Sequence, residues 1–115
     1  MLPRPSRLKR SRDFQNVYKR RQSWASPHLA FYVRLRTPRE GCVSRLGFVI
    51  SKKIAKRAHD RNRLKRRLRE ICRNQVLPHI ERPFDGLFVA RTASTELTFA
   101  ELSSEVSTLI RQAGL

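Results

Sequence analysis

The sequence is poor in cysteine, glycine and acidic residues, and it contains no long apolar run. Its 115 residues include two cysteines, four glycines and nine aspartates and glutamates. Cys42 and Cys72 have neither a CxxC pair nor a histidine at ligand spacing, so no disulfide framework or zinc site is indicated. The longest apolar stretches, residues 29–33 and 46–50, are far shorter than the roughly 20 residues that a membrane span needs. We therefore expect no membrane contact and a cytoplasmic protein.

The scarce acidic residues also bear on catalysis. They are scattered, and no two carboxylates share a helix face at a spacing that would bind magnesium. The three histidines are isolated, and the sequence has no glycine-rich phosphate loop and no Gly-x-Ser-x-Gly motif to organise a nucleophile. These patterns predict a binding module with no catalytic residue and no bound metal of its own.

What the sequence has in excess is positive charge. Twenty-six lysines and arginines against nine acidic residues give a net charge of +17. Residues 1–73 hold 23 of the bases and four of the acids (+19), whereas residues 74–115 hold three bases and five acids (−2). A charge of this size repels itself and is relieved when phosphates neutralise it. The expected partner is therefore RNA or DNA, bound mainly by the first two thirds of the chain.

The N-terminal region predicts a basic arm followed by a helix. Residues 1–10 carry two prolines and four bases without apolar periodicity, so we expect a flexible arm that becomes ordered on binding, and a single RNA-binding domain over residues 11–115. Ser11 is suited to cap a helix that ends near residue 21. Phe14, Val17 and Tyr18 share one face of this helix. Phe14 and Tyr18 either pack in the core or form a platform on which RNA bases stack.

Two strands are predicted next. Residues 28–36 and 46–50 both alternate between apolar residues and other residues, and residues 37–41 between them are typical of a turn. We expect an antiparallel hairpin, with a further short edge strand possible near residues 37–43. The second face of the hairpin would display an aromatic ring among arginines, with Gly47 leaving room for nucleic acid to approach. These residues are Tyr32, Arg34, Arg36 and Arg45.

Residues 51–73 predict a basic amphipathic helix. The stretch holds eleven lysines and arginines and two acids. Its apolar residues recur at helical spacing, at Leu64, Leu68, Ile71 and Cys72. We expect the helix to begin near His59 or Asp60, with Asp60 as the N-cap. The face opposite the apolar stripe carries Asn62, Arg66, Arg69 and Arg73, and it would meet the nucleic acid.

The remainder predicts a strand and a closing helix. Residues 84–91 contain an apolar run typical of a buried strand, and a strand, a helix and a strand in sequence predict a parallel crossover. Thr98 and Glu101 form a capping box before an amphipathic helix that reaches Gly114. The predicted fold is an α/β two-layer sandwich, a small mixed sheet of about four strands with three helices in the order helix, strand, strand, possible strand, helix, strand, helix.

Several of these segments resemble the protein subunit of bacterial ribonuclease P. The family's hallmark is an Arg-Asn-Arg element followed by Lys-Arg, which the chain has from Arg61 to Arg66. The resemblance extends to Arg7-Leu8, to Asp13-Phe14 with Val17-Tyr18, to residues 46–53, and to the last strand and helix. It covers residues 7–113, and several family segments occur in the family's order.

The resemblance implies a partner, a reaction and two sets of site residues. The protein would bind the catalytic RNA and the 5′ leader of precursor tRNA, and the RNA, with its own Mg²⁺, would cut the leader; the protein would be monomeric outside the complex. The resemblance implies that the catalytic RNA is contacted by Arg61, Asn62, Arg63, Lys65, Arg66 and Arg69, with Lys52 and Lys53 beside them. The helical pattern adds Arg73 to this predicted RNA-binding set. The residues implied for the leader cleft are Phe14, Tyr18, Tyr32, Ser51 and Arg91. The resemblance also implies a left-handed crossover around the basic helix, which is rare. A ribosomal or chaperone-like RNA-binding protein is the alternative.

Overall fold

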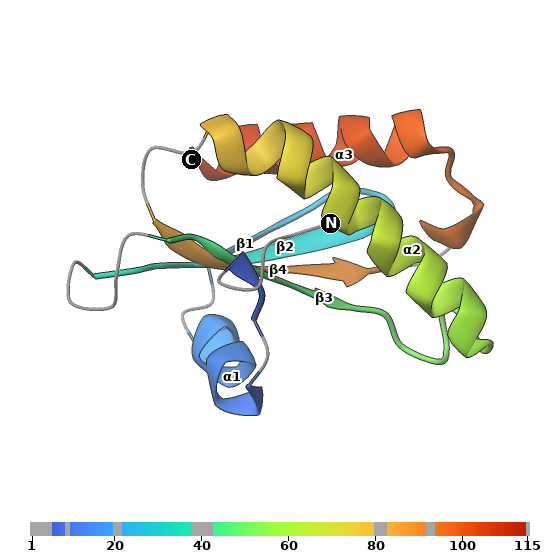
Figure 1. Cartoon of the computed structure of the whole chain (residues 1–115), viewed down its shortest axis with the longest axis horizontal. Coiled ribbons are helices and arrows are strands. Elements are labelled where there is room, and N and C mark those ends of the chain that lie inside the picture. The colour runs from blue at the N-terminus through green and yellow to red at the C-terminus, as the bar shows by residue number, and fades with distance from the viewer. Residues whose placement is uncertain are drawn as a thin grey trace.

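The described part of the chain forms seven α-helices and β-strands (Figure 1). The computed structural model describes residues 6–8, 10–19, 22–37, 43–79, 83–91 and 94–114. The elements are α1 (Ser11–Lys19), β1 (Gln22–Ala25), β2 (Leu29–Leu35), β3 (Arg45–Val49), α2 (Ala58–Ile71), β4 (Phe84–Ala90) and α3 (Phe99–Ala113). A π-helical turn, Cys72–Val76, and a 3₁₀ turn, Leu77–His79, extend α2, and a second 3₁₀ turn, Ser94–Glu96, precedes α3. Over these ranges no helix is both long and apolar enough to cross a membrane.

The four strands form one mixed sheet in the order β1-β2-β4-β3. Strand β2 pairs antiparallel with β1 and β4, while β3 pairs parallel with β4. The parallel crossover from β3 through α2 to β4 is therefore confirmed. The expected hairpin between β2 and β3 is wrong, because β4 lies between them. Six of the seven residues of β4 are buried, and such a strand needs neighbours on both sides.

The strand missing from the sequence prediction is β1. It is short and polar, and Trp24 is its one large apolar residue, so its periodicity is too weak to detect. The alternative edge strand near residues 37–43 falls mostly on residues 38–42, which lie outside the described residues, and Thr37 and Val43 are not in strands.

The helices cover the two faces of the sheet unequally. Helices α2 and α3 lie side by side on one face, and α1 lies on the opposite face near one end of the strands (Figure 1). The main core fills the space under α2 and α3, where the Phe31 and Phe88 rings stack with centroids 4.4 Å apart. A smaller cluster of Leu8, Val17 and Leu87 lies under α1. The sheet and the pair α2 and α3 form the two expected layers.

The helix ends show which capping signals the chain uses. The predicted box of Thr98 and Glu101 is present at the start of α3, and Gly114 ends that helix with φ 73°, in the left-handed region that favours glycine. Helix α2 begins at Ala58 with Arg57 as its N-cap and no side-chain cap. The expected N-cap at Asp60 is wrong. Asp60 instead lies in the first turn, where its negative charge interacts favourably with the positive end of the helix dipole. Helix α1 begins at Ser11, which is its first residue and not its cap.

Residues 6–8 pack against the sheet. The Leu8 amide donates to the Leu46 carbonyl at 2.9 Å, and Arg7 forms a parallel bridge with Leu46 on the outer edge of β3. Ser6 and Leu8 are buried. The edge of β3 and the cluster under α1 hold these three residues in place. The flexible arm over residues 1–10 stays a prediction. Residues 1–5 lie outside the described residues.

Candidate nucleic-acid interface

Helix α2 separates its packing residues from its charged residues. Leu64, Leu68 and Ile71 are buried against the sheet and α3, as the apolar stripe predicted. The rest of the helix surface presents predicted RNA contacts, of which Asn62, Arg63, Arg66 and Arg73 are exposed and Lys65 and Arg69 are half-buried. The structure thus brings these residues onto one side of the molecule, and their part in RNA binding stays a prediction.

The loop before α2 is held by Arg61. Its Nη1 donates to the carbonyls of Ala55 and Lys56, at 2.9 Å in both cases. The amides of Ile54 and Ala55 donate to the Ser51 carbonyl at 3.1 Å, which makes a tight turn with Lys52 and Lys53 exposed. Arg61, predicted as an RNA contact, therefore ties the end of this loop to the first turn of α2.

An open hollow of about 470 Å³ lies beside the first half of α2, and none of the described residues that line it is acidic. The lining residues are His59, Arg63, Arg66 and Arg67. Arg67 also donates from Nη1 to the Leu97 carbonyl at 3.3 Å, which ties α2 to the segment before α3. A shallow concave surface lined by cations suits a phosphate backbone better than a small neutral ligand.

The aromatic residues predicted for the leader cleft meet under α1. Phe14 and Tyr32 are half-buried against the cluster of Leu8, Val17 and Leu87, and the Tyr18 and Tyr32 rings meet edge to face with centroids 5.0 Å apart. Tyr18 is 39% exposed, so part of its ring is open to a ligand. Burial, and then the neighbouring Tyr32, raises the pKa of Tyr18 above its ordinary value, so the phenol stays protonated at neutral pH.

Gly47 makes room for Phe14. A Cβ atom on Gly47 would lie 2.9 Å from Cε1 of Phe14 and 2.7 Å from Cδ2 of Leu87. Any side chain here would therefore displace the Phe14 ring from the sheet. The prediction that Gly47 leaves space for nucleic acid is wrong, because Phe14 fills that space.

Ser51 and Arg91 lie away from the aromatic residues. Strand pairing puts Gly47, Leu87 and Tyr32 in one row across the sheet, and Arg91 comes four residues after Leu87, which is about 13 Å along a strand. Between the two groups the sheet surface carries the small apolar residues Ala30, Val49 and Val89, all half-buried. Helix α1 does not extend over this end of the sheet (Figure 1). The predicted leader residues thus border an uncovered strip of sheet.

Arg91 is fixed by the loop before β2. Its Nη1 donates to the Ser26 carbonyl at 2.9 Å, and its amide donates to the His28 carbonyl at 2.8 Å. The Ser26 hydroxyl donates to Glu105 on α3, and His28 Nδ1 lies 2.7 Å from the other oxygen of that carboxylate. Burial raises the pKa of Glu105, but the hydrogen bonds from Ser26 and His28 outweigh it and hold the pKa below its ordinary value. Glu105 therefore stays ionised and clamps the loop that positions Arg91.

The arginines expected to surround Tyr32 are bound to a carboxylate. Asp85, which is 1% exposed, lies between Arg34 and Arg45 in the strand register. Arg45 binds it with two hydrogen bonds of 2.8 and 2.7 Å, Arg34 lies at 3.4 Å and Arg36 at 3.8 Å. The prediction that these arginines form a base-stacking surface with Tyr32 is wrong, because they form ion pairs with Asp85 instead. This buried acid lies in the apolar run of β4, where the sequence interpretation overlooked it.

The described ranges contain no cluster of three histidine, cysteine or acidic side chains that could hold a metal ion. Cys72 is a free thiol in the core, and burial raises its pKa, so it stays protonated and packs as an apolar residue. Cys42 lies outside the described residues.

Comparison with known proteins connects this chain to a family. The sequence model of the family described as Ribonuclease P matches residues 2–114. The chain belongs to the ribonuclease P protein family. Members of this family are the protein component of ribonuclease P, an RNA-containing endoribonuclease that processes the 5′ leader of tRNA.

Relatives in sequence and in structure agree with this assignment. The ribonuclease P protein component of Clostridium kluyveri is 37% identical over 110 residues, covering 95% of each chain. The Staphylococcus aureus RNase P protein superposes with a TM-score of 0.82 at 28% identity, covering 94% of each chain. The Thermotoga maritima RNase P protein gives 0.80 at 28% identity, covering 92% of this chain and 96% of its own. The fold implied by the resemblance to ribonuclease P proteins is therefore confirmed.

Proposed function

We propose that this ribonuclease P protein uses two separate surfaces for two RNA partners. The charged side of α2, together with Lys52 and Lys53, docks the catalytic RNA. The opposite face of the sheet, beside α1, binds the 5′ leader of precursor tRNA. The observation that carries the proposal is this separation: α2 and α1 lie on opposite faces of one sheet, so both partners have room to bind together (Figure 1).

The chemistry of each surface supports its assignment. The α2 side offers cations from a rigid, well-packed helix, which suits the phosphates of a folded RNA of fixed shape. The α1 side offers the partly exposed Tyr18 ring, a strip of small apolar side chains and Arg91 at its end. Single-stranded RNA is typically held by stacking on aromatic rings together with cationic contacts to its backbone.

The protein would contribute binding while the RNA carries the reaction. In this proposal residues 11–115 act as one RNA-binding domain, the protein is a monomer outside the complex and works in the bacterial cytoplasm, and Mg²⁺ is held mainly by the RNA. Neutralising phosphates with the charge of +17 would lower the amount of Mg²⁺ that the RNA needs to keep its active shape.

Reconstitution tests the proposal directly. The full-length protein is added to a bacterial ribonuclease P RNA at a Mg²⁺ concentration too low for the RNA to act alone, and cleavage of precursor tRNA is followed on a gel. We expect cleavage at the mature 5′ end to be restored. Absence of any stimulation would overturn the proposal, and cleavage by the protein without RNA would contradict the assignment of the reaction to the RNA.

Replacing Tyr18 tests the leader surface. In the reconstituted complex we expect Tyr18→Ala to weaken binding of precursor tRNA by roughly 1–3 kcal/mol, about 5- to 150-fold, because one stacking ring is lost. Mature tRNA has no leader, so its affinity should not change. Equilibrium binding of both tRNAs measures the difference, with Tyr18→Phe, which keeps the ring, as the matched control. Equal losses for precursor and mature tRNA would show that Tyr18 acts only in packing.

A further inference from the structure

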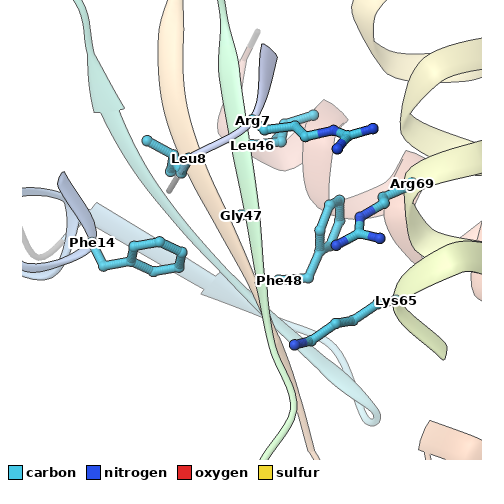
Figure 2. Close-up of a pocket in the computed structure, with 8 residues that line it drawn as sticks. All are labelled: Arg7, Leu8, Phe14, Leu46, Gly47, Phe48, Lys65 and Arg69. Atoms are coloured by element: carbon cyan, nitrogen blue, oxygen red, sulfur yellow. The ribbon is translucent and has the colours of Figure 1, made fainter. Parts of the chain in front are cut away.

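The uncovered strip of sheet beside α1 runs from an aromatic end to a cationic end. At the aromatic end the Phe14 ring extends from α1 toward Gly47 on β3 (Figure 2). At the cationic end Arg91 follows β4, about 13 Å along the strand beyond Leu87, which pairs with Gly47. Arg91 is exposed. A long side chain at the end of a strand is mobile unless neighbouring groups hold it, so the contacts of Arg91 decide how well this end can bind a ligand.

The loop before β2 holds Arg91 at two points. The Nη1 atom of Arg91 donates to the Ser26 carbonyl at 2.9 Å, and its backbone amide donates to the His28 carbonyl at 2.8 Å. A guanidinium group carries several N–H donors, so the contact with Ser26 still leaves donors for a phosphate. The position of the Arg91 guanidinium thus depends on where this loop lies.

The loop is in turn held by one carboxylate, that of Glu105 on α3. The Ser26 hydroxyl donates to Oε1 of Glu105, and the His28 amide donates to the same oxygen at 3.1 Å. His28 Nδ1 lies 2.7 Å from Oε2. The Glu105 side chain is only 17% exposed, so these hydrogen bonds are largely shielded from water. Glu105 therefore fixes both residues whose carbonyls hold Arg91.

The sign of the charge on Glu105 separates two explanations of its effect on RNA. By charge alone, an acid near an RNA-binding surface repels phosphates, so its removal should strengthen binding. A positioning effect has the opposite sign. Without Glu105 the RNA would itself have to immobilise the Arg91 side chain, and that loss of entropy weakens binding.

We propose that Glu105 is a positioning residue for the 5′ leader: through the loop of Ser26 and His28 it holds Arg91 where a leader phosphate passes the end of the strip. The inference rests on the proposed function, because it takes the leader to lie on this strip. It adds that leader binding depends on α3, which lies on the opposite face of the sheet from α1 (Figure 1). Only a leader long enough to extend from Tyr32 to Arg91 makes this contact.

Equilibrium binding to the complex of a bacterial ribonuclease P RNA with the full-length protein tests this role. The ligands are mature tRNA and precursor tRNAs whose leaders are shortened one nucleotide at a time. We expect Glu105→Ala to weaken binding of the long-leader precursors about 2- to 12-fold, the effect of one side chain that the leader must now immobilise. Leaders that end before Arg91, and mature tRNA, should bind with unchanged affinity. A loss that is equal at every leader length, or no loss at any length, would overturn the positioning role.

Two further variants separate the hydrogen bonds of Glu105 from its charge. Glu96→Ala removes the same charge from an exposed position before α3 and should cause no loss at any leader length. Glu105→Gln keeps an oxygen that can accept from the Ser26 hydroxyl and the His28 amide, so it should recover most of the affinity. A long-leader loss in either variant as large as that of Glu105→Ala would overturn the role of these hydrogen bonds. If Glu105→Ala does not fold, Ser26→Ala breaks the same link from the loop, with the same dependence on leader length expected.

A double-mutant cycle shows whether Glu105 acts through Arg91. Arg91→Ala should weaken binding of long-leader precursors about tenfold, because a hydrogen bond to a charged group is lost. Adding Glu105→Ala should then cause no further loss, and an additive loss would overturn the proposal. If Arg91→Ala itself binds precursor tRNA normally, the leader does not reach this end of the strip and the proposed leader surface is wrong there. If Arg91→Ala weakens binding and Glu105→Ala does not, the positioning role alone is wrong.

Discussion

Replacing Asp85 by Asn is expected to lower the free energy of unfolding by about 3–5 kcal/mol, the range seen when one partner of a buried ion pair is removed. Asn keeps the shape of the side chain but removes the charge that Arg34 and Arg45 meet from the two neighbouring strands. The cost should be high because Asp85 is 1% exposed and the guanidinium groups around it are largely shielded from water. Urea denaturation measures the change, since guanidinium chloride would screen the charges.

The matched control is Glu96→Gln, which removes one negative charge from an exposed position and should change stability by less than about 0.5 kcal/mol. A double-mutant cycle then divides the effect among the arginines. Coupling to Asp85 should be larger for Arg45, with bonds of 2.7 and 2.8 Å, than for Arg36 at 3.8 Å. If Asp85→Asn is as stable as Glu96→Gln, the arginine cluster does not hold the centre of the sheet together.

Local signals in the sequence carried most of the secondary structure. The stripe of Leu64, Leu68 and Ile71 predicted both α2 and the side on which it packs, and the box of Thr98 and Glu101 predicted the start of α3. These features succeed because the residues that determine them are neighbours in the chain. The charge pattern likewise predicted a polyanionic partner, because net charge does not depend on the fold.

What failed was long-range pairing. The order β1-β2-β4-β3 depends on β4 inserting between β2 and β3. The local sequences of β2 and β3 do not indicate this insertion. Asp85 was overlooked for the same reason, because its arginine partners come from other strands. A lone acid in an apolar strand was nevertheless a usable signal, since a buried charge needs partners of opposite sign. Long-range pairing also explains why Arg7 was predicted to be part of a flexible arm: its bridge partner Leu46 lies far along the chain.

The predicted site residues show the same contrast between local signals and long-range pairing. Those on α2 share one side of the molecule because one helix carries them, and a helical wheel is enough to find them. The leader residues come from α1 and from three strands or their ends, so their relation depends on the register of the sheet. This register places Ser51 and Arg91 four residues, about 13 Å along a strand, beyond the row that contains Tyr32. The family resemblance supplied this grouping, which periodicity alone does not contain.

Replacing both Arg63 and Arg66 by Ala should weaken binding of the catalytic RNA about 10- to 100-fold at moderate salt and lower the slope of log affinity against log salt by about 1.4–1.8, the share of two phosphate contacts. Both side chains are exposed and line the open hollow beside α2, so the fold should be unaffected. Filter binding across a salt series measures the slope, with Arg111→Ala as a control that changes charge far from α2 along the chain. An unchanged slope would mean that this side of α2 does not face the RNA. Arg111→Ala removes one charge, whereas the double variant removes two. If the loss of affinity per charge removed is the same in both, the net charge of the protein binds RNA without a defined docking surface.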